Sequence, residues 1–137
     1  MIKLNIVKNI PYKKFYCLYE SALSKNQENI EACLISSYDK ELCEVNARVV
    51  NIKFINQDQW IFFSNYNSPK SHEFNTHDQI SATFFWNKIS SQVRLKAHIK
   101  KTAIEISDNH FSSRSFKKNA LAISSKQSER ISSYEDV

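Results

Sequence analysis

Cationic side chains stand among packing residues between positions 48 and 70. Arg48 and Lys53 flank a mostly apolar run, and Lys70 follows a Ser/Asn-rich turn that contains Ser64 and Ser68. Guanidinium and ammonium groups make charge-assisted hydrogen bonds to phosphate oxygens. The pattern therefore predicts a site for a phosphate group. Charges that protect an edge strand from aggregation are the alternative for Arg48 and Lys53.

Two features of this segment bear on its geometry. Arg48 and Lys53 are separated by an odd number, so on a regular strand they point to opposite faces. They can serve one ligand only if Lys53 lies at a strand end or at a bulge. Ser68-Pro69 predicts a helix start, with Ser68 as N-cap and Pro69 as first residue. That helix end would attract an anion, although ordinary capping explains Ser68 equally well.

A second group of polar residues lies further along the chain. His110, Arg114 and Lys118 are spaced by four, which would form one cationic stripe on a helix. A solvated helix face is the common alternative. Gln92 and Gln127-Ser128 both donate and accept hydrogen bonds, which suits the edge of a heterocycle.

The composition limits the class of protein. The chain has 137 residues, a net charge of +5 and 42% hydrophobic residues, as expected of one domain with a real core. Glycine is absent, which excludes a Gly-rich phosphate loop and leaves the tight turns to Asn, Asp and Ser. We expect a cytoplasmic protein with no membrane partner, because the sequence has neither a signal peptide nor an apolar run long enough to span a bilayer.

Cysteine and histidine give weak signals. Cys17, Cys33 and Cys43 contain no Cys-x-x-Cys pair, and we expect reduced, mostly buried side chains. His72 and His77 have only Glu73 and Asp78 nearby, which does not predict a metal site.

Hydrophobic periodicity predicts a mainly β fold with peripheral helices. A helix should run from Pro11 to about Asn26, with Tyr12, Phe15, Tyr16, Tyr19 and Ala22 on its core face. A short helix follows Pro69, and a last helical region is capped by Ser107 and continues to about residue 125. Strands are predicted at 30–37, 43–53, 59–64 (as a central strand), 79–87 and 90–103. We expect one domain over 1–137, an N-terminal helix region at 1–27 and a loose tail at 128–137.

Six motifs in register resemble the pyridoxamine 5′-phosphate oxidase family, from about Glu31 to the end. The family's Arg-x-Val-Leu-Leu-Lys is similar to residues 48–53, and its Tyr-Thr-Asn-Tyr-x-Ser-Arg-Lys to residues 63–70. Its Phe-Tyr-Trp and Gln-Val resemble residues 84–86 and 92–93. Its Tyr-Phe-x-Ser-Arg-Pro is similar to residues 110–115, and its Lys-Gln-Ser and Ile-Ser to residues 126–128 and 131–132.

The resemblance implies an antiparallel split β-barrel that binds flavin mononucleotide, as a homodimer with the flavin at the subunit boundary. It implies oxidation of pyridoxamine or pyridoxine 5′-phosphate by oxygen. The implied flavin contacts are Arg48, Ser64, Ser68, Lys70, Gln92, Gln127 and Ser128. The implied contacts of the phosphorylated substrate are Lys53, His110, Arg114 and Lys118. We nominate no catalytic acid or base, because the cofactor carries the chemistry.

The sequence departs from the family in ways that affect activity. Pro69 replaces an Arg that the family uses on the flavin phosphate, and His110 and Lys118 replace a Tyr and a Ser. The family continues past the position of Val137 through a segment with a Trp and an Arg-x-His. We therefore expect substrate binding with weak or absent oxidation.

Two other functions remain open at the level of sequence. One is a non-catalytic protein that binds flavin or pyridoxal phosphate. The other is a basic barrel that binds nucleic acid through aromatic residues and a cationic groove. Residues 90–103 have outward cations but no aromatics, so we expect no nucleic-acid partner.

Overall fold

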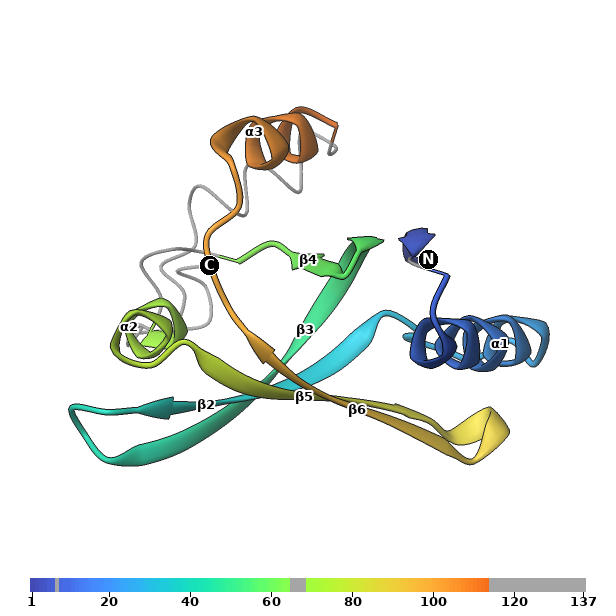
Figure 1. Cartoon of the computed structure of the whole chain (residues 1–137), viewed down its shortest axis with the longest axis horizontal. Coiled ribbons are helices and arrows are strands. Elements are labelled where there is room, and N and C mark those ends of the chain that lie inside the picture. The colour runs from blue at the N-terminus through green and yellow to red at the C-terminus, as the bar shows by residue number, and fades with distance from the viewer. Residues whose placement is uncertain (7, 65–68, 114–137) are drawn as a thin grey trace, which may run out of the picture.

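The structure is a computed structural model that describes residues 1–6, 8–64 and 69–113. Three helices and six strands, with one short 3₁₀ helix, make up this part of the chain (Figure 1). In chain order they are β1 (Lys3–Ile6), α1 (Ile10–Ser24), β2 (Ala32–Asp39), β3 (Glu44–Gln57), β4 (Gln59–Phe62), α2 (Pro69–Thr76), β5 (Gln79–Trp86), η1 (Asn87–Ile89), β6 (Ser91–His98) and α3 (Ile104–Ser112).

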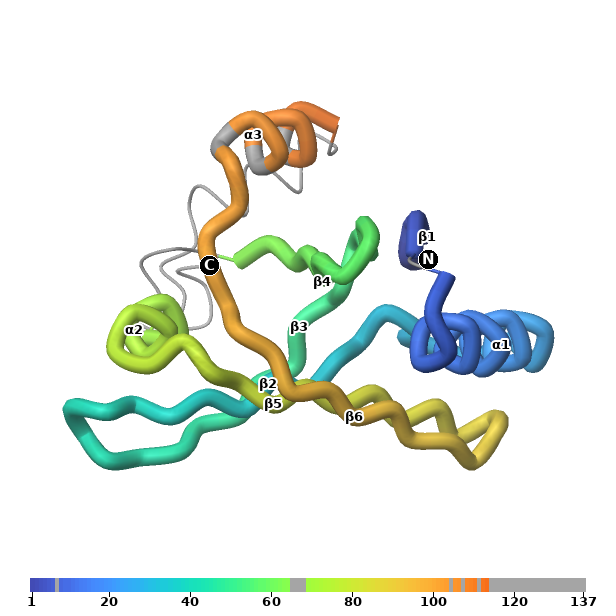
Figure 2. The backbone as a smooth tube through the Cα atoms, in the orientation of Figure 1, coloured from blue at the N-terminus to red at the C-terminus, as the bar shows by residue number. Residues whose placement is uncertain are grey.

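The sheet is built around the long strand β3. Its first part pairs antiparallel with β2, which pairs with β5, which pairs with β6. Its last residues pair with β4 and, in parallel, with β1. Figure 2 follows β3 from the β2–β5–β6 sheet to its far end beside β4. A strand shared in this way curves the structure into an open, barrel-like sheet, which confirms the predicted fold class.

The core lies on one face of this sheet. Figure 1 shows α1 and α2 on the same side of β2, β5 and β6. Phe15 and Tyr19 of α1 pack against Phe84 and Trp86 of β5, with ring centroids 5.7–6.2 Å apart. These aromatic pairs bury the largest side chains of the described chain.

The opposite face of the sheet exposes apolar side chains. Leu34 on β2 and Val49 on β3 are direct neighbours in the register, and they are 43% and 64% exposed. Phe85 on β5 is 67% exposed. Among the described helices, none covers this face in Figure 1.

Because the chain has no glycine, other residues adopt the left-handed backbone conformation in its turns. A left-handed backbone occurs at Asn26, Asn29, Cys43, Gln57 and Ser90. Asn and Ser confirm the expectation, since they tolerate this conformation. Cys43 and Gln57 do not follow it, which shows that the strand pairing on each side imposes the turn geometry.

Most predicted elements are confirmed, with ends shifted by a few residues. Asn9 caps α1 through a 3.3 Å bond from the Tyr12 backbone N–H to its side chain, and Pro69 is the first residue of α2. Two predictions are wrong at the helices. Tyr16 points away from the core, and Ser107 lies inside α3 instead of capping it. The predicted tail at 128–137 lies outside the described residues.

Two predictions about the strands are wrong, and both errors arise from long-range pairing. The prediction of a central strand at 59–64 is wrong, because β4 pairs with β3 alone among the described strands. The four-residue β1 was missed, since its pairing partner lies 51 residues later. The prediction for the cysteines is also wrong in part: Cys33 is buried, but Cys17 and Cys43 are exposed.

Within residues 1–6, 8–64 and 69–113, no helix has the length and apolar character needed to cross a membrane.

Candidate functional site

A buried charged cluster joins α2 to the sheet. We call it the Arg48 cluster, and it consists of Ser37 on β2, Arg48 on β3, and Lys70 and Glu73 on α2. The Arg48 guanidinium donates to the Ser37 hydroxyl through Nη1 and to the Glu73 carboxylate through Nη2. The Ser37 hydroxyl donates to the same Glu73 oxygen. The cluster fixes the position of α2, because charge-assisted bonds removed from water are strong.

In the cluster the charge of Arg48 acts on Lys70, and both residues are predicted flavin contacts. Burial lowers the pKa of the Lys70 ammonium, the positive charge of Arg48 lowers it further, and Glu73 partly offsets both. Arg48 also lies over the Phe74 ring, 5.8 Å from its centroid. Two cations near the first turn of a helix can hold an anion such as a phosphate group.

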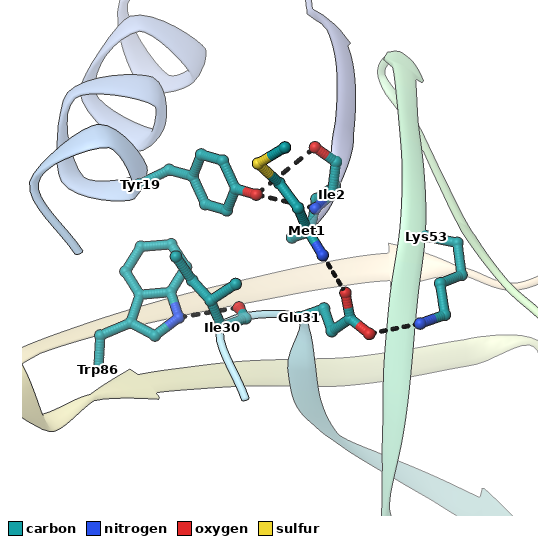
Figure 3. Close-up of polar contacts among 7 residues, drawn as sticks. All are labelled: Met1, Ile2, Tyr19, Ile30, Glu31, Lys53 and Trp86. Carbon is teal, nitrogen blue, oxygen red and sulfur yellow. Dashed lines mark hydrogen bonds and ion pairs between the residues drawn. The ribbon is translucent and has the colours of Figure 1, made fainter. Parts of the chain in front are cut away.

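Lys53 has a different neighbour. It sits where the register between β3 and β4 shifts, so the bulge that a shared site would need is present. Its ammonium pairs with one oxygen of the Glu31 carboxylate. The other oxygen accepts a hydrogen bond from the N-terminal ammonium of Met1 at 2.7 Å (Figure 3). Burial raises the pKa of Glu31, but Lys53 and the N-terminal amine outweigh it and the net pKa is lowered.

The edge-strand alternative fails for Lys53 and is incomplete for Arg48. Lys53 lies where β3 has a neighbour on each side, since Ile52 N donates to Glu31 O and β4 pairs opposite. Residues 44–51 of β3 pair with β2 alone among the described strands. The Arg48 side chain nevertheless turns inward to the buried cluster.

His110 lies in another part of the molecule. Its ring stacks on Phe63 with centroids 3.8 Å apart and meets the Phe54 ring edge-on. Together with Lys3, Asn5 and Asn56, it lines a cavity of about 550 Å³ between β1, β3, β4 and α3. That volume falls in the range of small-molecule sites. Phe54 and Phe63 are thus the neighbours of His110, whereas Lys53 pairs with Glu31.

Gln92 lies on the opposite face of the sheet from Arg48. Arg48 is opposite Ile35, which is opposite Ala82, which is opposite Leu95, so these four share one face. Gln92 is three residues from Leu95 and therefore points the other way. Three strand spacings of about 4.8 Å also separate β3 from β6, about 14 Å in all.

The remaining predicted contacts divide into two groups. Ser64 is half-buried and lies two residues after the end of β4. Ser68, Arg114, Lys118, Gln127 and Ser128 lie outside the described residues.

The sequence reasoning missed Ser37, Glu73 and Glu31. For Glu73 a signal existed, since it stands one helical turn after Lys70, where i, i+3 pairs meet. For Ser37 and Glu31 nothing local marked the contact, because their partners lie 36 and 22 residues away.

The histidines near α2 have ordinary partners. His77 packs edge-on against Tyr38, and His72 Nε2 lies 3.0 Å from a Glu41 oxygen. Side-chain atoms of Asp39, Glu41 and His72 lie within 4.8 Å of one another. However, one Asp39 oxygen already accepts the backbone N–H groups of Glu41 and Leu42.

The chain is similar to known oxidases in sequence. It is 32% identical over 124 residues to a pyridoxine/pyridoxamine 5′-phosphate oxidase from Legionella pneumophila (strain Lens), across 90% of this chain and 57% of that protein. It is 39% identical over 88 residues to the protein of the same name from Burkholderia cenocepacia (strain HI2424), across 64% of this chain and 41% of that protein. The chain therefore spans about half the length of these relatives. No family model matches it.

Two solved structures share the fold. PhzG from Burkholderia lata 383, solved with tetrahydrophenazine-1-carboxylic acid, superposes with a TM-score of 0.84 at 18% identity, over 91% of this chain and 61% of that one. A pyridoxamine 5′-phosphate oxidase-related, FMN-binding protein from Nostoc punctiforme PCC 73102 gives a TM-score of 0.72 at 8% identity, over 95% of this chain and 72% of that one. At these identities the likeness concerns the fold alone.

Proposed function

Because the chain belongs to the pyridoxamine 5′-phosphate oxidase family, we propose that it binds flavin mononucleotide and oxidises pyridoxamine or pyridoxine 5′-phosphate with oxygen. When bound, the flavin accepts a hydride equivalent from the substrate and passes electrons to oxygen. The protein binds and orients both molecules. No side chain of the described residues is assigned a proton-transfer role.

The observation that carries the proposal is the Arg48 cluster. Arg48 and Lys70 come from two elements far apart in sequence and meet at the first turn of α2, where a flavin phosphate would find two cations. The group fits this site chemically, since guanidinium and ammonium donors are the usual partners of phosphate oxygens. Ser64, two residues after the end of β4, and Ser68, Gln127 and Ser128 complete the proposed flavin contacts.

The proposal includes a homodimer, and the position of Gln92 supports it. One flavin cannot reach both Arg48 and Gln92 of the same chain, because they lie on opposite faces of the sheet, three strands apart. A second copy can supply Gln92 to the Arg48 cluster of the first. The exposed Leu34, Val49 and Phe85 lie on the same face as Gln92, and they give a second copy an apolar surface to bury beside Gln92.

For the substrate, we propose a phosphorylated pyridine held by Lys53, His110, Arg114 and Lys118. The cavity beside His110 has apolar walls and several side-chain amides, which suits a ring with mixed donors and acceptors.

One observation favours the non-catalytic alternative, a protein that binds flavin or pyridoxal phosphate without turnover. Lys53 is neutralised by Glu31 in this structure, so a substrate phosphate must compete for it. Misplacement of a substrate by a small distance can cost on the order of 100-fold in rate.

A two-step experiment tests the proposal. Titration with flavin mononucleotide, followed by absorbance and calorimetry, should give a saturable complex, with riboflavin binding more weakly because it lacks the phosphate. No bound flavin at excess ligand would refute the cofactor. Peroxide release from flavin-loaded protein with pyridoxamine 5′-phosphate then separates the two functions: turnover near 1 per second or faster indicates an ordinary enzyme, and binding without peroxide indicates the non-catalytic protein.

A further inference from the structure

One carboxylate is buried beside the proposed phosphate site. Glu73 is only 5% exposed, and its Oε2 atom accepts hydrogen bonds from Arg48 and from Ser37. An ionised carboxylate removed from water needs such partners, since an unpaired buried charge is very costly. The Arg48 guanidinium is therefore the counter-charge of Glu73 within the protein.

The Arg48 guanidinium keeps donors that its bonds within the cluster do not use. Arg48 and Lys70 are two cations, and Glu73 is the one anion among the four residues of the cluster. Burial lowers the pKa of Lys70, the charge of Arg48 lowers it further, and Glu73 partly offsets both. Arg48 has five N–H donors, and its bonds to Ser37 and Glu73 engage one on each terminal nitrogen. The cluster is thus able to take a further negative charge.

We propose that Glu73 is an internal competitor for phosphate: its carboxylate occupies the Arg48 guanidinium when no anion is bound, and this competition sets the affinity of the site. The inference rests on the proposed function for the identity of the natural ligand, the flavin phosphate. The same competition acts on inorganic phosphate, which makes it testable without flavin. The alternative is a purely structural contact, in which Glu73 only docks α2 on β2.

The variant Glu73→Gln separates the two roles. Gln keeps the size of the side chain and can still bond to Arg48 and Ser37, but it removes the negative charge. If Glu73 competes, the anion-free protein becomes less stable, because Arg48 loses the carboxylate that it pairs with. Phosphate should then bind more tightly and restore the lost stability. Glu28→Gln is the matched control, since Glu28 is exposed in the turn before β2.

The experiment follows thermal unfolding of the full chain at pH 7 against inorganic phosphate, with sodium chloride as the ionic-strength control. For Glu73→Gln we expect a lower melting temperature in chloride and a phosphate midpoint at least about tenfold below that of the wild type. The interaction of two unit charges a few ångström apart inside a protein is larger than a tenfold change requires. Glu28→Gln should match the wild type in both respects.

Three results would overturn the proposal. One is a folded Glu73→Gln protein whose phosphate midpoint equals or exceeds that of the wild type. Another is a Glu73→Gln protein that is unfolded in chloride and is not rescued by phosphate. The third comes from the double variant Arg48→Gln/Glu73→Gln, which removes both partners: it should fold without responding to phosphate, and a response like that of the wild type contradicts the competition.

Titrations of flavin mononucleotide and riboflavin into the same variants distinguish a failure of the competition from a failure of the proposed function. The expected result is tighter binding of flavin mononucleotide to Glu73→Gln with unchanged binding of riboflavin. If the phosphate response follows the expectation but no variant binds flavin mononucleotide, the inference stands and the proposed function fails. If flavin mononucleotide binds and Glu73→Gln leaves its affinity unchanged, the competition is refuted and the proposed function stands.

Discussion

The Tyr19 hydroxyl accepts a hydrogen bond from the backbone N–H of Ile2 at 2.8 Å, which joins the middle of α1 to the residue before β1 (Figure 3). Both residues are buried. Burial is also the main cause of the raised pKa of Tyr19, so this hydroxyl keeps its proton at neutral pH. The N-terminal strand is thus attached to the core by a buried bond between segments distant in sequence.

Tyr19→Phe should destabilise the fold by about 1–3 kcal/mol, because it leaves a buried backbone N–H without this acceptor. Denaturant unfolding gives the change in free energy. Tyr16→Phe is the control, since Tyr16 is on the same helix but 44% exposed, and it should change stability by less than about 0.5 kcal/mol. Equal effects of the two substitutions would contradict the importance of the bond.

Glu31→Gln should make the free energy of unfolding less dependent on pH in the acid range. Because the folded pKa of Glu31 is lowered, its ion pairs contribute stability above its unfolded pKa and lose it as pH falls through the folded pKa. At pH 7 we expect a loss of about 1 kcal/mol, which shrinks toward zero below the folded pKa.

Unfolding free energies of the wild type and Glu31→Gln, measured from pH 7 to pH 3, check this. Glu28→Gln serves as the control for the loss of one surface carboxylate. Profiles of the wild type and Glu31→Gln that stay parallel over the whole range would show that the pairs with Lys53 and the N-terminal amine do not stabilise the fold.

Lys70→Met should weaken flavin mononucleotide binding by about 10- to 100-fold, since one charge-assisted bond to phosphate is lost. Met keeps the buried stem of the side chain, which limits damage to α2. Riboflavin affinity should not change, because riboflavin has no phosphate. Lys14→Met, at an exposed position of α1, is the control, and calorimetry gives the affinity of each ligand for the wild type and for both variants. A parallel loss of riboflavin binding would indicate a general disturbance of the site instead.

Leu34→Lys should dissociate the proposed homodimer. Leu34 lies beside Val49 on the uncovered face of the sheet, and a charge there would have to be buried between the copies, at a cost. Light scattering should show the mass of a monomer, with weaker flavin binding because Gln92 is then no longer supplied. Ile10→Lys is the control at an exposed apolar site on α1. A wild-type mass that is already monomeric with flavin present would refute the dimer.

Local sequence signals determined the type and order of the main elements. Pro69 marked the start of a helix because its fixed backbone angle suits the first helical position. Strict alternation marked β5 and β6, since side chains of a half-buried strand follow a period of two. The cations at positions 48 and 70 led to the prediction of a phosphate site, which stays a prediction. Each of these signals acts within a few residues, which is why it can be read from the chain alone.

Tertiary structure decided which residues meet. The pairing of Arg48 with Glu73 and of Lys53 with Glu31 depends on strand register and on where α2 packs against the sheet. No local pattern encodes either. The parallel pairing of β1 with the end of β3 and the edge position of β4 follow from chain segments that are far apart in sequence. The same register places Arg48 and Gln92 on opposite faces of the sheet. Long-range pairing fixes these relations, and it therefore decides which of the predicted ligand contacts lie on the same face of the sheet.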